Sequence, residues 1–273
     1  MEALKIDGAR ILITGSSRWI VEAAVLELAG RGARLAIAAR GKDELERVSS
    51  AVEAASGTAA AIIPTDVSKE AEVVAMVAAA EQALGGIDIL VNNAGLGLNA
   101  AVAEIDPIDL RHVFEVNVVA PHVATRAALP AMLQRRRGHI VNVGSVASHI
   151  ASPYLGGYSA TKFALKALSD ALRIELQGSG VHVTLICPGP IATEFVARSK
   201  GDPRGRVPLR PVGAPAADVG RCIARAISHN SAEAFVPAYY QALVGANSLV
   251  PQAMRVAGKR GMVVATRFAE RFL

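Results

Sequence analysis

The chain has 273 residues, a hydrophobic fraction of 52% and a formal net charge of +5. This length and composition favour one large α/β domain and argue against disorder. Two cysteines disfavour a disulfide framework or a cysteine-rich metal cluster and indicate a reducing, cytoplasmic setting, and no apolar run is long enough for a membrane span or a secretion signal.

The basic charge is concentrated near the C-terminus. Residues 251–273 carry five cations and one acid, so this segment contributes +4 of the total of +5. No basic surface interleaved with aromatic residues accompanies it, and we expect no nucleic-acid partner.

Apolar runs bounded by turn residues predict strands, and longer amphipathic stretches predict helices. The expected strands are 11–13, 34–39, 59–64, 87–91, 139–143, 181–187 and 234–236. The expected helices are 20–29, 68–84, 107–134, 154–177 and 216–228, together with 43–55. Ser68 and Asp106 are the expected N-caps of two of them. This alternation predicts a Rossmann-type doubly wound parallel sheet of about seven strands, with helices on both faces, in a single domain.

Polar segments follow the expected strands. Because ligands of such sheets bind beyond the carboxyl ends of the strands, these segments should share one rim. They are 14–18, Arg40, Asp66, 92–95, Ser145 and 188–193.

The turn after the first strand, TGSSRWIV at 14–21, is the expected phosphate site. A tight turn before a helix directs backbone N–H groups and the positive helix end at one point. Gly15 fits this role, but Trp19 and Val21 stand where a nucleotide-binding turn usually has glycines.

Tyr158 and Lys162 are four residues apart on an expected helix, so their side chains share a face. A nearby ammonium should lower the pKa of the phenol by roughly 1 to 3 units and make it a usable acid or base for a carbonyl/alcohol pair. Ser145 follows a strand and could hold the substrate oxygen.

Over roughly residues 6 to 240 the chain resembles the short-chain dehydrogenase/reductase family. The motifs that carry the resemblance are TGSSRWIV (14–21), DV (66–67), NNAG (92–95), Asn117, Ser145 in NVGS, YSATK (158–162) and PGPIAT (188–193). The resemblance implies reversible hydride transfer between a nicotinamide and a ketone, aldehyde or alcohol.

The resemblance also implies roles for individual residues. Asn117, Ser145, Tyr158 and Lys162 match the catalytic tetrad, in which Asn117 holds a proton-relay water and Lys162 also binds the nicotinamide ribose. The implied cofactor contacts are Gly15, Ser16, Ser17, Arg18, Ile20, Arg40, Asp66, Val67, Asn92, Ala94, Gly95, Tyr158, Lys162, Pro188, Ile191 and Thr193. Residues 1–240 would form the dinucleotide-binding and catalytic domain.

The second expected strand ends in Ala38, Ala39 and Arg40, without the acid that would bind the ribose hydroxyls of NAD. Arg18 lies in the first turn, and two guanidinium groups suit a 2′-phosphate. We therefore expect NADP, with NAD as the alternative.

Trp19 and Val21 leave three interpretations open. In the first, Trp19 fills the dinucleotide site and leaves a binding or scaffold protein of the same fold. In the second, the turn is shifted and NADP binds more weakly. In the third, both residues are engineered substitutions in a once-active enzyme. The function predicted is an NADP(H)-dependent oxidoreductase, with the cofactor-incompetent protein as its rival.

Apolar residues near the rim predict an apolar carbonyl or alcohol substrate. They are Leu96, Leu98, Ile150, Tyr154, Leu155, Ile191 and Phe195. We expect residues 190–215 to form a substrate lid. Residues 241–273 are expected to form a basic amphipathic extension that docks on the rim or on another subunit, with weak membrane-surface contact as the alternative. We also expect a homo-oligomer and, because none of the six histidines has metal-like spacing, no metal.

Overall fold

The structure is a computed structural model and describes residues 4–16, 20–191, 199–200 and 213–249, with backbone only at 20 and 21. A seven-stranded sheet has the order β3-β2-β1-β4-β5-β6-β7, and every pair of neighbouring strands is parallel. The strands are β1 (Arg10–Thr14), β2 (Arg34–Ala39), β3 (Ala61–Pro64), β4 (Ile89–Asn92), β5 (Gly138–Val143), β6 (Val181–Pro188) and β7 (Glu233–Val236). The strand order reverses between β1 and β4, where such sheets bind ligands.

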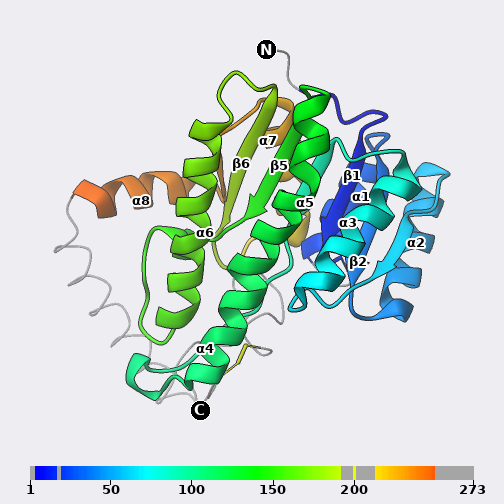
Figure 1. Cartoon of the computed structure of the whole chain (residues 1–273). Coiled ribbons are helices and arrows are strands. Elements are labelled where there is room, and N and C mark those ends of the chain that lie inside the picture. The colour runs from blue at the N-terminus through cyan, green and yellow to red at the C-terminus, as the bar shows by residue number, and fades with distance from the viewer. Residues whose placement is uncertain (1–3, 17–19, 192–198, 201–212, 250–273) are drawn as a thin grey trace.

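Helices cover both faces of the sheet (Figure 1). One apolar core lies under α1 (Ile20–Ala29), α2 (Lys42–Ser56) and α7 (Ala216–Ser228). The other lies under α3 (Glu70–Leu84), α5 (Ala120–Gln134) and α6 (Gly156–Glu175). Successive strand residues alternate between the two cores, as Ile11 and Leu12 do, because side chains alternate across a strand. The predicted doubly wound fold with helices on both faces is therefore confirmed.

Shorter elements connect and extend this framework. They are α4 (Pro107–Phe114), α8 (Tyr239–Leu249), η1 (Val102–Glu104), η2 (Glu115–Val119) and η3 (Val146–Ser148). Within the described residues, no helix is long and apolar enough to cross a membrane. The extension expected at 241–273 is described only as far as the end of α8, and the lid expected at 190–215 lies mostly outside the described residues.

Two expected helix starts were wrong. Helix α6 begins at Gly156 rather than at 154, because Tyr154 has a positive φ of 64°. Helix α3 begins at Glu70, because Ser68 donates its hydroxyl to Asp66 in a turn instead of capping the helix. By contrast, Asp106 caps α4 as expected, accepting a hydrogen bond from the Ile108 N–H at 2.7 Å.

The long helix expected over 107–134 begins and ends at those residues, but it is not uniformly α-helical. A π-helical turn, η2, separates α4 from α5, so the helix widens at Glu115–Val119. Turns of this kind shift the following side chains around the helix axis and are frequent at functional sites. Asn117 lies in this turn and is fully buried.

A buried ion pair fixes the beginning of β1 to the segment before β4. The Arg10 guanidinium donates to both carboxylate oxygens of Asp88, at 2.8 Å and 2.7 Å. Burial raises the pKa of Asp88, but the hydrogen bonds and charge of Arg10 outweigh it and hold the pKa below its ordinary value. The pair therefore stabilises the fold above the ordinary aspartate pKa, and that stabilisation is lost as the pH falls through the lowered pKa.

Replacing Asp88 with alanine is expected to lower the free energy of unfolding by about 2 kcal/mol at neutral pH, because Arg10 would keep a half-buried charge without its partner. The matched control is Glu22→Ala, which removes an equally bidentate but exposed pair with Arg47 and should cost less than about 1 kcal/mol. Urea denaturation of both variants measures the difference. Equal losses of unfolding free energy in the two variants would contradict a larger stabilisation by the Arg10–Asp88 pair.

Candidate active site

The loops that follow β1 and β4 are fastened together at the point where the strand order reverses. Thr14 Oγ1 accepts hydrogen bonds from the backbone N–H groups of Asn93 and Ala94, at 3.0 Å and 3.1 Å. Gly15 has a φ of +76°, and a Cβ there would lie 2.8 Å from the Cα of Ala94. Gly15 thus lets the turn after β1 pack directly against the backbone of Ala94, and no side chain extends from this position of the rim.

The Ser16 side chain, expected to contact the cofactor, is buried and does not face an exposed phosphate site. It is fully buried, and its hydroxyl donates to the carbonyl of Ile13 at 2.7 Å. Its side chain therefore holds the turn together. Of the other cofactor contacts expected here, Ser17, Arg18 and the side chain of Ile20 lie outside the described residues, as do Trp19 and the side chain of Val21.

Asp66 presents an ionised carboxylate on the same rim after β3. Its Oδ1 accepts from the backbone N–H and the hydroxyl of Ser68, at 3.1 Å and 2.8 Å. Burial raises the pKa of Asp66, but these hydrogen bonds and the charges of Arg40 and Lys69 bring it below its ordinary value. Arg40 is exposed, and its influence on Asp66 places both charges near the ends of β2 and β3.

Buried amides connect β4 and β5 to α6. Asn92 Nδ2 donates to Asn142 Oδ1 at 2.9 Å, and Asn142 Nδ2 donates to Ser169 Oγ at 2.8 Å. Asn92 therefore supports the rim from below. Neither Asn142 nor Ser169 was expected at the site from the sequence. For Asn142 the available signal was a polar residue in a largely apolar strand.

Asn117 connects the loop after β4 to α6. Its amide oxygen accepts from Leu96 N–H at 2.8 Å, and its Nδ2 donates to Leu96 O at 2.8 Å and to Thr161 Oγ1 at 3.0 Å. Thr161 in turn donates to the carbonyl of Tyr158 at 2.7 Å. The π turn therefore places Asn117 where its hydrogen bonds connect α6, the helix that carries Tyr158, to the loop after β4.

Ser145, Tyr158 and Lys162 meet at the carboxyl ends of β5 and β6. Ser145 Oγ donates to Pro188 O at 3.2 Å and also makes a hydrogen bond with Tyr158. Lys162 Nζ donates to Val143 O at 2.8 Å and lies 5.7 Å from the centroid of the Tyr158 ring. A Cβ on Gly95 would lie 3.7 Å from Lys162 Nζ, so the ammonium lies next to the rim that begins at Gly15.

The expected lowering of the Tyr158 pKa was wrong. Burial raises the pKa of Tyr158 to about 12, although the hydrogen bond with Ser145 acts in the opposite direction. Burial also lowers the pKa of Lys162 to about 8. The reason is that both groups are removed from water, so desolvation disfavours the charged form of each. At neutral pH the phenol is therefore protonated and has a proton that it could donate.

An apolar wall adjoins the phenol. Tyr158 packs in a small cluster with Leu98 and Val113, and Leu96, Ile105, Leu110 and Ala147 pack against it. Ile150 and Leu155 are half-buried, and Ile191 bridges to Ala214. Phe195 and Thr193 lie outside the described residues. The site thus combines a protonated phenol, a buried ammonium and an apolar surface next to a glycine-lined rim.

Comparison with known proteins agrees with this geometry. Residues 9–203 match the short chain dehydrogenase family. The ketoacyl reductase HetN of Nostoc sp. is 35% identical over 187 residues, which cover 68% of this chain and 65% of that relative, slightly less than two thirds of its length.

Solved structures give the same family. A short chain dehydrogenase/reductase of Burkholderia phymatum in complex with NAD matches with a TM-score of 0.83 and 27% identity, over 92% of this chain and 96% of that one. A metagenomic short-chain oxidoreductase in complex with NADP matches with a TM-score of 0.70 and 28% identity, over 82% and 92% of the two chains. The chain therefore belongs to the short-chain dehydrogenase/reductase family, a class of NAD(P)-dependent oxidoreductases.

Proposed function

We propose that the protein reduces a small apolar ketone or aldehyde to an alcohol with NADPH, in a reversible reaction. The observation that carries the proposal is the meeting of Ser145, Tyr158 and Lys162 beside the glycine-lined rim at the strand-order reversal. Spectrophotometric assay of NADPH consumption with a panel of apolar ketones and aldehydes tests it. Turnover of none of them, by protein shown to bind NADPH, would contradict it.

The residues present fit a nicotinamide dinucleotide. Gly15 and Gly95 leave a surface without side chains, and Lys162 and Asp66 provide charged groups along it. Lys162, Tyr158 and the backbone near Gly15 and Gly95 would hold the cofactor, which supplies the hydride when bound.

The protein side of the reaction is proton donation. The Tyr158 phenol, protonated at neutral pH, donates its proton to the carbonyl oxygen as that oxygen gains negative charge. The Ser145 hydroxyl, already oriented beside Tyr158, turns from Pro188 O to donate a hydrogen bond to the same oxygen. Lys162 holds positive charge near the phenol and stabilises the phenolate that the transfer leaves behind.

The apolar cluster around Tyr158 and Leu98 supports an apolar substrate. A ketoacyl chain, the kind of substrate named for the Nostoc relative, suits such a wall.

We also propose a homo-oligomer, because large apolar side chains are exposed on α5 and α6: Leu133, Phe163, Leu168 and Ile174. Light scattering during size-exclusion chromatography measures the oligomeric state.

The preference for NADPH over NADH rests on the end of β2. No acid follows Ala39 there, and the exposed Arg40 is close enough to lower the pKa of Asp66. A guanidinium at this end of the strand suits a 2′-phosphate.

Arg40→Ser is therefore expected to weaken NADPH binding by about tenfold to a hundredfold, the loss of one charge-assisted hydrogen bond of roughly 1.5–3 kcal/mol, and to leave NADH binding unchanged. The matched control is Arg34→Ser, at the opposite end of the same strand, which should change neither dissociation constant. Fluorescence titration of both variants with both cofactors provides the measurement. An equal effect of Arg40→Ser on the two cofactors would overturn the assignment.

The rival function is a cofactor-incompetent protein of the same fold that binds a partner instead of catalysing. Trp19 and Val21, which replace glycines of the family turn, favour it. It predicts that this chain binds no nicotinamide cofactor.

A further inference from the structure

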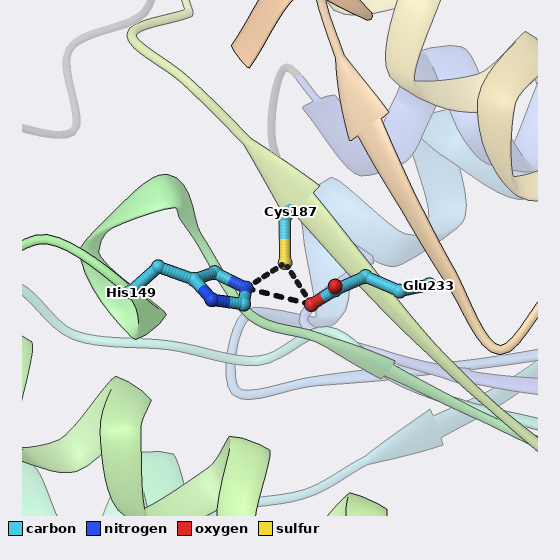
Figure 2. Close-up of side chains that lie close together, drawn as sticks. All are labelled: His149, Cys187 and Glu233. Carbon is cyan, nitrogen blue, oxygen red and sulfur yellow. Dashed lines mark hydrogen bonds and ion pairs between the residues drawn. The ribbon is translucent and has the colours of Figure 1, made fainter. Parts of the chain in front are cut away.

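Three potential metal ligands converge at the edge of the sheet, close to but separate from the groups proposed for proton transfer. They are His149, just after η3, Cys187 near the end of β6, and Glu233 at the start of β7 (Figure 2). Their ligand atoms all lie within 4.8 Å of one another. Sequence spacing predicted no such cluster, because these residues are far apart in the chain. The pairing of β6 with β7 brings Cys187 near Glu233, and the segment after η3 brings His149 to both.

The distances resemble those of a tetrahedral site. Sγ of Cys187 lies 3.7 Å from Nε2 of His149 and 3.3 Å from Oε1 of Glu233, and those two atoms lie 2.7 Å apart. Bond lengths of roughly 2.3 Å to sulfur and 2.0–2.1 Å to nitrogen and oxygen place tetrahedral ligands about 3.3–3.6 Å apart. The largest adjustment needed is a separation of His149 from Glu233 by about 0.6 Å.

The arrangement differs from that of a nucleophile activated by histidine. In such a relay the two nitrogens of the imidazole face different partners. Here the same atom, Nε2 of His149, faces both the thiol and the carboxylate, and all three atoms point at one position (Figure 2). Convergence on one point is the geometry that an ion requires.

Charge and access also suit a divalent cation. A thiolate, a carboxylate and a neutral imidazole carry two negative charges, which a dication neutralises. Cys187 is buried, whereas the Glu233 side chain is 30% exposed and provides a route from solvent. The nearby Lys166 has its own partner, Asp170, at 2.5 Å. The Phe235 ring packs against His149 at 5.5 Å between centroids and orients the imidazole.

We propose that His149, Cys187 and Glu233 bind one Zn²⁺ ion, with water as the fourth ligand. Histidine nitrogen, cysteine sulfur and carboxylate oxygen are all zinc ligands, and a thiolate is too soft a ligand for Mg²⁺ or Ca²⁺. Binding replaces the S–H group of Cys187 with a Zn–S bond and releases its proton to solvent, so the affinity rises with pH. No electron is transferred.

The site has a structural consequence for Ser145. His149 follows Ser145 by four residues, and Cys187 precedes Pro188, whose carbonyl accepts the hydrogen bond from Ser145. Zinc would fasten both segments to the edge strand β7. Bound zinc is therefore expected to raise the melting temperature of the full chain.

Zinc content and cobalt spectroscopy test the proposal on the full chain. After removal of metal with a chelator and equilibration with ZnCl₂, we expect about one tightly held zinc per chain. Replacement with Co²⁺ should give a thiolate-to-cobalt charge-transfer band. Cys187→Ser should abolish the band, and Glu233→Gln should weaken zinc binding more than about tenfold.

Cys222→Ser is the matched control, since Cys222 is the other cysteine of the chain and lies on α7; it should keep both the zinc and the cobalt band. Circular dichroism of the metal-free variants establishes that they are folded, and the partly exposed Glu233 serves if Cys187→Ser does not fold. The proposal is overturned if the unmodified chain holds no stoichiometric zinc. It is equally overturned if zinc binding survives unchanged in the folded variants.

Discussion

Tyr158→Phe is expected to lower kcat for carbonyl reduction by about 10²–10⁴-fold while leaving NADPH binding nearly unchanged. The change removes only the phenolic oxygen, which is the proposed proton donor and makes a hydrogen bond with Ser145. The ring remains in its cluster with Leu98 and Val113, so the fold is preserved. Steady-state kinetics with NADPH and an apolar ketone provide the measurement.

Tyr239→Phe is the control for this change, because Tyr239 is exposed on α8 and should leave kcat unaltered. The direction of the Tyr158 pKa gives a second expectation. With a pKa of about 12 the phenol stays protonated, so reduction should not lose its proton donor between pH 6 and pH 9, whereas alcohol oxidation should rise with pH across ~6–9. A Tyr158→Phe variant that retains most of its kcat would contradict the role of the phenol.

Lys162→Met is expected to reduce activity by at least about 10²-fold and yet to raise stability at neutral pH. Burial lowers the pKa of Lys162 to about 8, below the ordinary lysine value of about 10.4, and this difference corresponds to a stability cost on the order of 3 kcal/mol. Loss of the hydrogen bond to Val143 O offsets about 1 kcal/mol of the gain.

The pH dependence of this stability gain distinguishes the removal of a buried ammonium from better packing of the methionine side chain. In the unmodified protein the cost is fully present below the folded pKa of about 8 and disappears as the pH rises to the unfolded value near ~10.4. The stability advantage of Lys162→Met should therefore shrink between those values. Chemical denaturation at pH 7 and pH 10 measures it. An advantage that does not change with pH, or a variant less stable at pH 7, would contradict a buried ammonium at Lys162.

Much of the fold could be predicted because local pattern and tertiary packing agree. Seven short apolar runs became seven parallel strands, and the polar segments after them lie at the carboxyl ends of those strands, as expected. The π turn at Glu115–Val119 could not be predicted, because the sequence from 107 to 134 is compatible with a uniform α-helix. The buried amide contacts of Asn117 with Leu96 and Thr161 become visible only in three dimensions.

The site residues Ser145, Tyr158 and Lys162 could be found from sequence, since helical spacing and strand ends bring them together. The pKa values of Tyr158 and Lys162 could not be predicted from the sequence. Spacing predicts that Lys162 lies near Tyr158, but the depth of burial decides the pKa of each, raising that of the phenol and lowering that of the ammonium. The meeting of His149, Cys187 and Glu233 depends on strand pairing and was likewise outside the reach of spacing.

We propose that this chain, with Trp19 and Val21 in its first turn, binds NADPH. Isothermal titration calorimetry of NADPH into the unmodified chain and into the Trp19→Gly, Val21→Gly double variant tests it directly. The account predicts saturable binding at one site per chain of the unmodified protein, with tighter binding by the double variant. Binding by the double glycine variant alone would contradict it and would establish the cofactor-incompetent protein instead.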